Sequence, residues 1–244
     1  MNLPVPVLLV VFALQGWTES GVWKDSLLKN ILENIPGVKV VVVDYLDGKG
    51  KLAQFKSHLT AEEYALRAEK VFRQVQKDYP TALILVLGHS LGGIVARILC
   101  LKGLFPSRNM ILVGTPNHGI TYKSIGGPVF GILMYLLFWA LSSKHLCSVP
   151  VYRQLLRGNR FLLNILNVDG IPRDAYYIKG KRDPVVESLS SDPHNIGESV
   201  DCDHHLIPHN GRDVVDLSDK DRLALDNSAI PVIVRIVKNR LEHL

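Results

Sequence analysis

One stretch, residues 82–101, constrains the fold more than any other part of the chain. Six apolar residues at 82–87 lead directly into Gly-His-Ser-Leu-Gly-Gly at 88–93, and a second apolar segment follows at 94–101. A continuous apolar run that ends at glycine is typical of a strand buried on both faces. The stretch therefore predicts a strand, a sharp turn and a helix.

The turn carries the pattern G-x-S-x-G, with Ser90 at its centre. Glycine is required two residues before and after the serine, because side chains there would collide with the strand and the helix. Such a turn raises the serine hydroxyl above the sheet, at the amino end of the helix. Ser90 is therefore predicted as a nucleophile, although the five-residue pattern taken alone also occurs by chance.

The segment GHSLGGIVAR at 88–97 resembles the nucleophile segment of α/β-hydrolase lipases and esterases, including the lipase-like GPI inositol-deacylases. The resemblance implies a mostly parallel central sheet with helices on both faces and a helical lid insertion. It also implies hydrolysis of carboxylic esters through a Ser-His-Asp triad, without a metal or an organic cofactor.

Strand-like and helix-like segments alternate along the chain. Apolar residues at helical spacing predict helices over 22–35, from a capping box at Thr60 and from Ser228 onward. Such alternation specifies a parallel sheet covered on both sides. We expect one domain, 1–244, with 120–168 as a lid or cap insertion. Continuous apolar or β-branched runs predict further strands at 6–13, 38–43, 110–113 and 174–179.

The predicted first strand ends at Gln15-Gly16-Trp17, where lipases of this fold usually carry His-Gly. The glycine and the amide after it are retained. The resemblance therefore implies that the backbone N–H groups of Trp17 and Leu91 form the oxyanion hole. Gln15 departs from the lipase pattern, and an ordinary strand-to-loop turn also explains these three residues.

Asp183 lies in the loop GKRDPVV at 180–186, directly after the strand predicted at 174–179. The loop resembles the G-x-x-D-x-x-V turn of hydrolases, and this fold holds the acid that orients the histidine after a late strand. Asp183 is therefore the predicted acid, and turn chemistry before proline is the alternative explanation. Three weaker candidates are Asp174, Glu187 and Asp192.

The predicted base is His204, in a segment that resembles the end of the last strand of such lipases, with His209 five positions on. His205 is the alternative. His118 precedes the acid, whereas the fold has the order serine, acid, histidine, so we interpret His118 as structural or substrate-adjacent. A metal site at 201–205 is disfavoured, because adjacent residues of a strand point to opposite faces.

Residues 125–141 (IGGPVFGILMYLLFWAL) carry no charged side chain. They lie where lipases insert a lid, so Phe130, Met134 and Leu137 are predicted to bind an apolar acyl chain. A membrane span needs about 20 apolar residues, and a lid or pocket wall is favoured over a buried helix and over a span. A lid predicts a lipidic substrate and transient contact with a lipid interface.

Composition limits the partners and the cellular location that we expect for the protein. The net charge of +5 is spread without a run of five basic residues, which argues against a nucleic-acid partner. Three widely spaced cysteines, Cys100, Cys147 and Cys202, favour reduced thiols in the cytoplasm. Residues 1–14 are apolar like a signal peptide but contain no Lys, Arg or A-x-A site, so a first strand is favoured over secretion. Peripheral membrane association is a further alternative.

The assembled prediction is a serine hydrolase that cleaves esters of apolar acyl chains through an acyl-enzyme intermediate. A thioesterase or a lipid-anchor deacylase would use the same chemistry. A catalytically silent protein of this fold that binds lipid or a protein partner is the alternative of a different class. Loss of the serine, the histidine or the acid would favour that alternative, and the sequence retains a candidate for each.

Overall fold

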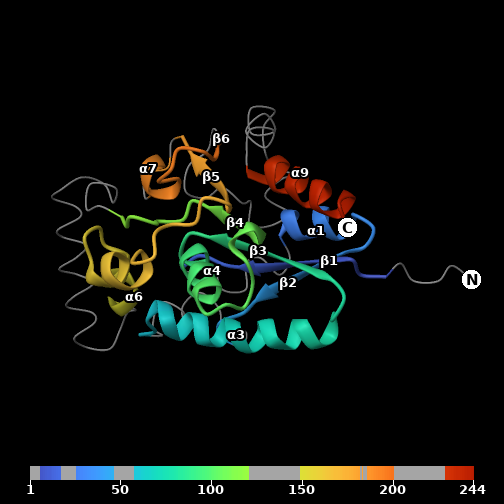
Figure 1. Cartoon of the computed structure of the whole chain (residues 1–244), viewed down its shortest axis with the longest axis horizontal. Helices are drawn as coiled ribbons and strands as arrows, with labels where there is room; N and C mark the ends of the chain where they lie inside the picture. Colours follow the sequence, from blue (N-terminus) through green and yellow to red (C-terminus); the bar gives the residue numbers. More distant parts are fainter. Residues whose placement is uncertain are drawn as a thin grey trace, which may run out of the picture.

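The computed structural model describes residues 6–17, 26–46, 58–120, 149–181, 183, 186–200 and 229–244. Within these ranges six strands form one sheet in the order β2-β1-β3-β4-β5-β6, and all neighbouring strands run parallel (Figure 1). The strands are β1 Leu9–Leu14, β2 Val38–Val43, β3 Leu83–His89, β4 Met110–Val113, β5 Tyr176–Gly180 and β6 Glu198–Val200.

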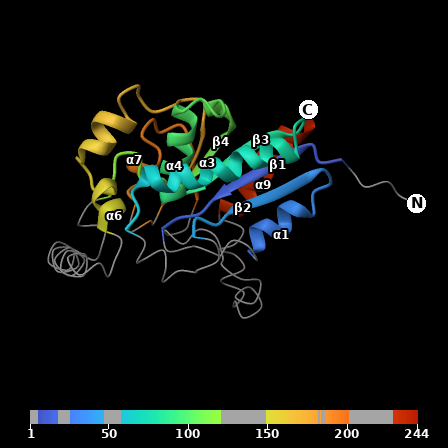
Figure 2. The ribbon, with the colours of Figure 1, turned by 90° about the horizontal axis from the view of Figure 1, so that it is seen from below.

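Helices cover both faces of this sheet. Helices α3 and α4 pack on one face, whereas α1 and α9 pack on the other (Figure 2). The predicted parallel sheet with helices on both sides is confirmed. The helices are α1 Leu27–Glu33, α3 Ala61–Asp78, α4 Leu91–Leu101, the 3₁₀ helix η2 Ser107–Asn109, α6 Val149–Leu155, the π-helix η4 Leu162–Leu166, α7 Ser188–Ser191 and α9 Ala229–Glu242.

Strand β1 lies between two hydrophobic cores, one on each face of the sheet, and contributes side chains to both. Its side chains alternate between the faces of the sheet, as the pleat requires, and each is at most 1% exposed. Val10, Phe12 and Leu14 belong to the core under α3 and α4. Leu9, Val11 and Ala13 belong to the core under α1 and α9. Burial on both faces explains why the strand is apolar without interruption.

The predicted capping box at the start of α3 is present. The Glu63 N–H donates to Thr60 Oγ1 at 3.3 Å, and the Thr60 N–H donates to Glu63 Oε2 at 2.7 Å. On the buried side of α3, the Phe72 ring meets the Phe12 ring edge-to-face with 5.1 Å between centroids. The cap and this contact fix α3 against the centre of the sheet.

Several predicted boundaries shift. The strand predicted from residue 6 begins at Leu9, and the strand predicted from residue 174 begins at Tyr176. Helix α4 begins at Leu91, so Ser90 stands at the amino end of this helix, as the sharp turn predicted. The apolar segment 125–141 and Ser228 lie outside the described residues. Among the helices that are described, none is long and apolar enough to cross a membrane.

Candidate active site

Ser90 occupies the sharp turn between β3 and α4. Its backbone has φ 50° and ψ −119°, a conformation that non-glycine residues rarely adopt. Such strain costs about 1–3 kcal/mol and persists only where the surrounding structure enforces it. Here the Ser90 N–H donates to the Val113 carbonyl of β4 at 2.9 Å, and the Ser90 carbonyl accepts from the Gly93 N–H at 3.0 Å. The side chain lies at the end of β3, and the residue is 8% exposed.

The two glycines that flank Ser90 in the G-x-S-x-G pattern sit against backbone. A Cβ atom on Gly88 would lie 2.6 Å from the Cα atom of Gly93. A Cβ atom on Gly92 would overlap the Leu14 carbonyl oxygen. Backbone atoms of a central strand and a helix cannot move aside as a flexible side chain can. The predicted steric reason for both glycines is therefore confirmed.

Replacement of Gly92 with alanine is expected to lower the free energy of unfolding by about 3 kcal/mol, because overpacking against rigid backbone forces the helix away from β1. The matched control is Gly103→Ala. Gly103 has φ 75° and no atom within 4 Å of the Cβ position, so only the left-handed backbone contributes, at about 1 kcal/mol. Urea unfolding followed by circular dichroism measures both values, and equal losses would contradict the close packing at Gly92.

The contact of Gly92 with Leu14 brings the end of β1 beside the amino end of α4. Leu91 is the first residue of α4, so its N–H has no acceptor within the helix. Trp17 follows β1, and its ring lies 6.2 Å from the ring of Tyr152 in α6, measured between centroids. The two segments predicted to form the oxyanion hole are thus neighbours. The roles of Trp17 and Leu91 stay predictions.

Gln15, which stands where lipases of this fold usually carry histidine, is completely buried. Its Nε2 donates to the Val43 carbonyl at the end of β2 at 2.7 Å, and its own carbonyl accepts from the Tyr45 hydroxyl at 3.3 Å. Gln15 therefore ties the carboxyl ends of β1 and β2 together. These contacts give the glutamine a structural role directly before Gly16.

Asp183 follows β5, at the same edge of the sheet as Ser90. The carboxyl ends of parallel strands all lie at one edge of the sheet, and α/β proteins bind their ligands at this edge. Asp183 is partly buried, and its Oδ1 accepts from the Val186 N–H at 2.8 Å. This bond is the turn chemistry foreseen as the alternative explanation. It is compatible with a catalytic carboxylate, and the role of Asp183 as the acid stays a prediction.

The three weaker candidates for the acid differ from Asp183 in place or in surroundings. Asp174 precedes β5 and so lies toward the opposite edge of the sheet. Glu187 is exposed and forms an ion pair with Arg157 at 3.4 Å. Asp192 is completely buried in an ion pair with a lysine of β5 at 2.9 Å. Topology therefore favours Asp183.

The predicted base His204 and its alternative His205 come after β6 in the chain and lie outside the described residues. The same holds for the predicted acyl-binding residues Phe130, Met134 and Leu137. Within the described ranges, no group of three or more His, Cys, Asp and Glu side chains is close enough to bind a metal ion.

His118 lies in the turn after β4, and its backbone N–H donates to Ser190 Oγ at 3.2 Å. The pKa of His118 is lowered below its ordinary value. The main cause is partial burial of the ring, and the positive charges of Arg157 and Arg97 add smaller effects. The imidazole is therefore neutral at neutral pH. Its backbone contact fits the structural interpretation of this histidine.

Solved structures similar to the chain cover nearly its whole length. A putative hydrolase from Agrobacterium vitis S4 is 16% identical, with a TM-score of 0.54 over 90% of both chains. A thermostable carboxyl esterase from Bacillus coagulans is 16% identical, with a TM-score of 0.54 over 97% of this chain and 91% of its own. A structure of the metagenome-derived lipolytic enzymes LipS and LipT is 12% identical, with a TM-score of 0.54 over 94% of both chains. The chain has the α/β-hydrolase fold.

No protein-family model and no curated protein sequence matches the chain. The α/β-hydrolase fold explains the layout of the edge where Ser90 lies. In this fold the nucleophile, the acid and the histidine follow one another along the chain. Ser90 follows β3 and Asp183 follows β5, in that order.

Arg97 and Asn117 connect the loops around this edge, and the sequence did not identify them as a pair. Arg97 lies on α4, is 2% exposed, and has its pKa lowered to about 10 by burial, so it remains charged at neutral pH. Its guanidinium donates to Asn117 Oδ1 at 3.2 Å and to the Leu166 carbonyl of η4 at 3.1 Å. The sequence contained one signal for a buried polar contact, a single arginine within an apolar helix. It could not identify the partners of Arg97, because they lie 20 and 69 positions away in the chain.

Proposed function

We propose that this chain is a serine hydrolase that cleaves carboxylic esters with apolar acyl chains. The observation that carries the proposal is the strained backbone of Ser90, with φ 50° between β3 and α4. Such a turn presents a serine hydroxyl at the amino end of a helix in the α/β-hydrolase fold. Strain at a non-glycine residue is concentrated at functional sites in proteins.

In the proposed mechanism, His204 takes the proton of Ser90 Oγ as that oxygen attacks the carbonyl carbon of the ester. Asp183 orients the imidazole and stabilises its protonated form. The N–H groups of Trp17 and Leu91 stabilise the oxyanion, a contribution of about 3 kcal/mol per donor. The alcohol leaves with the proton held by His204, and water then attacks the acyl-enzyme by the same route.

The proposed cap covers residues 120–168, with Phe130, Met134 and Leu137 against the acyl chain. One observation supports apolar surroundings beside the site: the ring of Trp17, just beyond β1, contacts the buried ring of Tyr152 in α6. An acyl chain that leaves the ester carbonyl near Trp17 would meet this aromatic surface.

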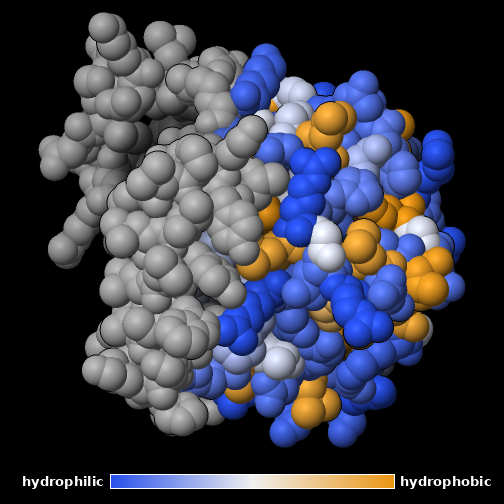
Figure 3. Space-filling view, turned by 90° about the vertical axis from the view of Figure 1, so that its left-hand side faces the viewer, coloured by the Kyte–Doolittle hydropathy of each residue, from blue (hydrophilic) through white to orange (hydrophobic). Residues whose placement is uncertain are grey.

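Contact with a lipid interface is proposed for residues 125–141. On the side of the molecule that carries α6, apolar side chains are interspersed with hydrophilic ones (Figure 3). Leu163, Ile165 and Val168 are each more than half exposed. Scattered apolar side chains are ordinary on protein surfaces, so the proposed lipid contact rests on the uncharged segment and not on these residues. A cytoplasmic location is likewise our proposal, on the cysteine content.

The test of this function is hydrolysis of p-nitrophenyl esters with acyl chains from C2 to C16. We expect kcat/KM to rise toward the long chains, because each buried methylene contributes about 0.8 kcal/mol. A fluorophosphonate is expected to label the protein once, on the peptide that contains Ser90, as found by mass spectrometry. The thioester of the preferred acyl chain, assayed in parallel, separates a thioesterase from an esterase.

Two outcomes would count against the proposal in different ways. A maximum at C2 to C6 would keep the ester chemistry and remove the apolar acyl pocket. Hydrolysis at no chain length, together with no phosphonate label on Ser90, would remove the catalytic function and favour a binding protein of this fold.

A further inference from the structure

Helix α7, Ser188–Ser191, lies between Asp183 and β6 and consists of a single turn. A helix of this length does not form on its own in water, so contacts with the rest of the protein must fix its position. Asp183 is tied to the beginning of this segment by the hydrogen bond from the Val186 N–H to its Oδ1. The position of Asp183 at the sheet edge therefore depends on what holds α7.

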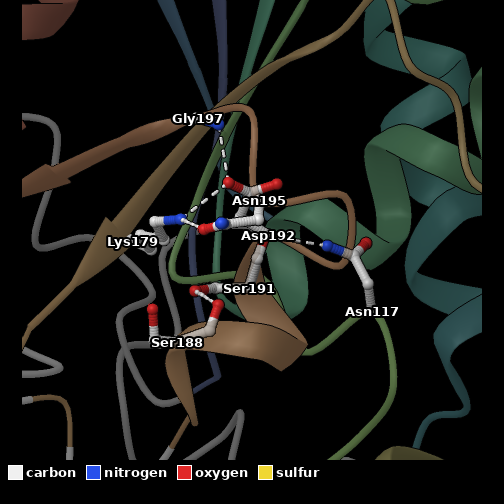
Figure 4. Close-up of polar contacts among 7 residues, drawn as sticks. All are labelled: Asn117, Lys179, Ser188, Ser191, Asp192, Asn195 and Gly197. Atoms are coloured by element: carbon white, nitrogen blue, oxygen red, sulfur yellow. Dashed lines mark hydrogen bonds and ion pairs between the residues drawn. The ribbon is translucent and has the colours of Figure 1, made fainter.

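One anchor of α7 comes from the turn after β4. Asn117 donates twice to the helix, from Nδ2 to the Ser191 carbonyl at 3.0 Å and from its backbone N–H to the Ser190 carbonyl at 3.0 Å. Figure 4 shows the Asn117 side chain reaching this region. Ser190 Oγ adds a hydrogen bond to the Gly119 carbonyl at 2.8 Å. These bonds hold the body of α7 against the turn that follows β4.

The second anchor is a buried ion pair at the carboxyl end of α7. Lys179 Nζ, from β5, lies 2.9 Å from Asp192 Oδ2 and donates to Asn195 Oδ1 at 2.8 Å (Figure 4). The side chains of Lys179 and Asp192 are 7% and 0% exposed. Asp192 Oδ2 also accepts from the Gly197 N–H at 2.6 Å. One carboxylate thus joins β5, the end of α7 and the turn into β6.

Stability alone does not explain the burial of these two charges. Burial raises the pKa of the Asp192 carboxyl, but the hydrogen bonds from Lys179 and from backbone N–H groups outweigh this effect and leave the pKa below its ordinary value. The Asp192 carboxylate is therefore ionised at neutral pH. Replacement of a buried ion pair by well-packed hydrophobic residues of similar volume is often neutral or stabilising. What the pair provides is one defined geometry between β5 and α7.

We propose that the Lys179–Asp192 ion pair is the positioning element for the acid of the triad, an inference that rests on the proposed function. The two residues are 13 positions apart in the chain, and their contact closes the loop that carries Asp183. The closed loop holds the Asp183 carboxylate at the sheet edge, where Ser90 also lies. Lys179 and Asp192 act through this loop and not on the substrate.

The test is the double variant Lys179→Met with Asp192→Asn. Methionine and asparagine have nearly the size of the residues that they replace, and neither leaves a buried charge alone. Asparagine also keeps an oxygen acceptor for the Gly197 N–H. We expect kcat for the preferred p-nitrophenyl ester to fall about 10- to 100-fold, since small displacements of catalytic groups have effects of this size. KM is expected to stay within about threefold, because the displaced Asp183 would stabilise the transition state less well without changing how tightly the ester binds.

A second readout follows the loop itself. In the double variant, the Val186 amide proton is expected to exchange with solvent about tenfold faster or more, because local opening is governed by local contacts. The Phe12 amide in β1 reports the global stability and is expected to keep its exchange rate. The matched control is Arg157→Gln, which breaks the exposed ion pair with Glu187 on the same segment. An exposed pair contributes little, so kcat and Val186 exchange should stay within about twofold.

Unchanged kcat in the folded double variant would overturn the inference, whether or not Val186 exchanges faster. If the wild-type protein hydrolyses none of the esters, the proposed function fails, and Val186 exchange alone decides whether the pair holds the loop. If circular dichroism shows that the double variant does not fold, the double variant Lys179→Gln with Asp192→Asn is the test. It removes both charges and leaves no buried charge alone, while glutamine keeps a donor for residue 192 and for Asn195. We expect kcat to fall about fivefold, and no loss would overturn the inference.

Discussion

Alanine in place of Ser90 is expected to lower kcat for the preferred p-nitrophenyl ester by about 10⁶-fold, the size of loss seen when the nucleophile of a serine hydrolase is removed. The substitution deletes only the hydroxyl. The bonds that hold the turn use the backbone of Ser90, from its N–H to the Val113 carbonyl and from the Gly93 N–H to its carbonyl. Fold and oxyanion-hole segments are therefore expected to survive, and the loss should fall on kcat.

The control for this substitution is Ser107→Ala. Ser107 donates its hydroxyl proton to Asp174 at 2.6 Å, before β5 and toward the opposite edge of the sheet. The kcat of the Ser107→Ala variant should stay within about twofold of the wild-type value, because surface substitutions distant from the active site usually have small effects. Turnover that survives in purified Ser90→Ala, or phosphonate labelling that persists there, would assign the activity to another group.

The parts of the site carried by local sequence could be predicted. The uninterrupted apolar run before Gly88 predicted β3, because burial on both faces requires it. The flanking glycines predicted the tight turn, and the structure shows the close backbone contacts that exclude a Cβ atom at Gly88 and Gly92. The capping box at Thr60 predicted the start of α3, because both of its hydrogen bonds connect residues three positions apart.

Features that depend on distant partners could not be predicted. The sequence predicted a sharp turn followed by a helix, but it did not show that Gly92, in the first turn of α4, packs against Leu14 of β1. In the sequence, Gln15 was recognisable only as a departure from the lipase pattern. Its structural role depends on a hydrogen bond to the Val43 carbonyl, 28 positions away in the chain. Lys179 was one residue of an expected strand. Its partner Asp192 was only a weaker candidate for the acid.

Asp183→Asn is expected to lower kcat about 10⁴-fold, because an amide leaves the histidine in the wrong tautomer and does not stabilise its protonated form. Asparagine is close in size to aspartate and keeps an oxygen acceptor for the Val186 N–H, which holds the turn. The fold should therefore be retained, and KM should change much less than kcat. Steady-state kinetics on the preferred p-nitrophenyl ester measure both constants.

The same substitution at the other carboxylates separates catalysis from structure. Asp174→Asn, toward the opposite edge of the sheet, should leave kcat within about twofold. Asp192→Asn should cause the smaller loss of a positioning residue, since its carboxylate acts through the loop that it closes with Lys179. A 10⁴-fold loss at Glu187→Gln with kcat retained at Asp183→Asn would move the acid to Glu187. The acid would then stand directly before α7, at its amino end, and not in the turn that follows β5.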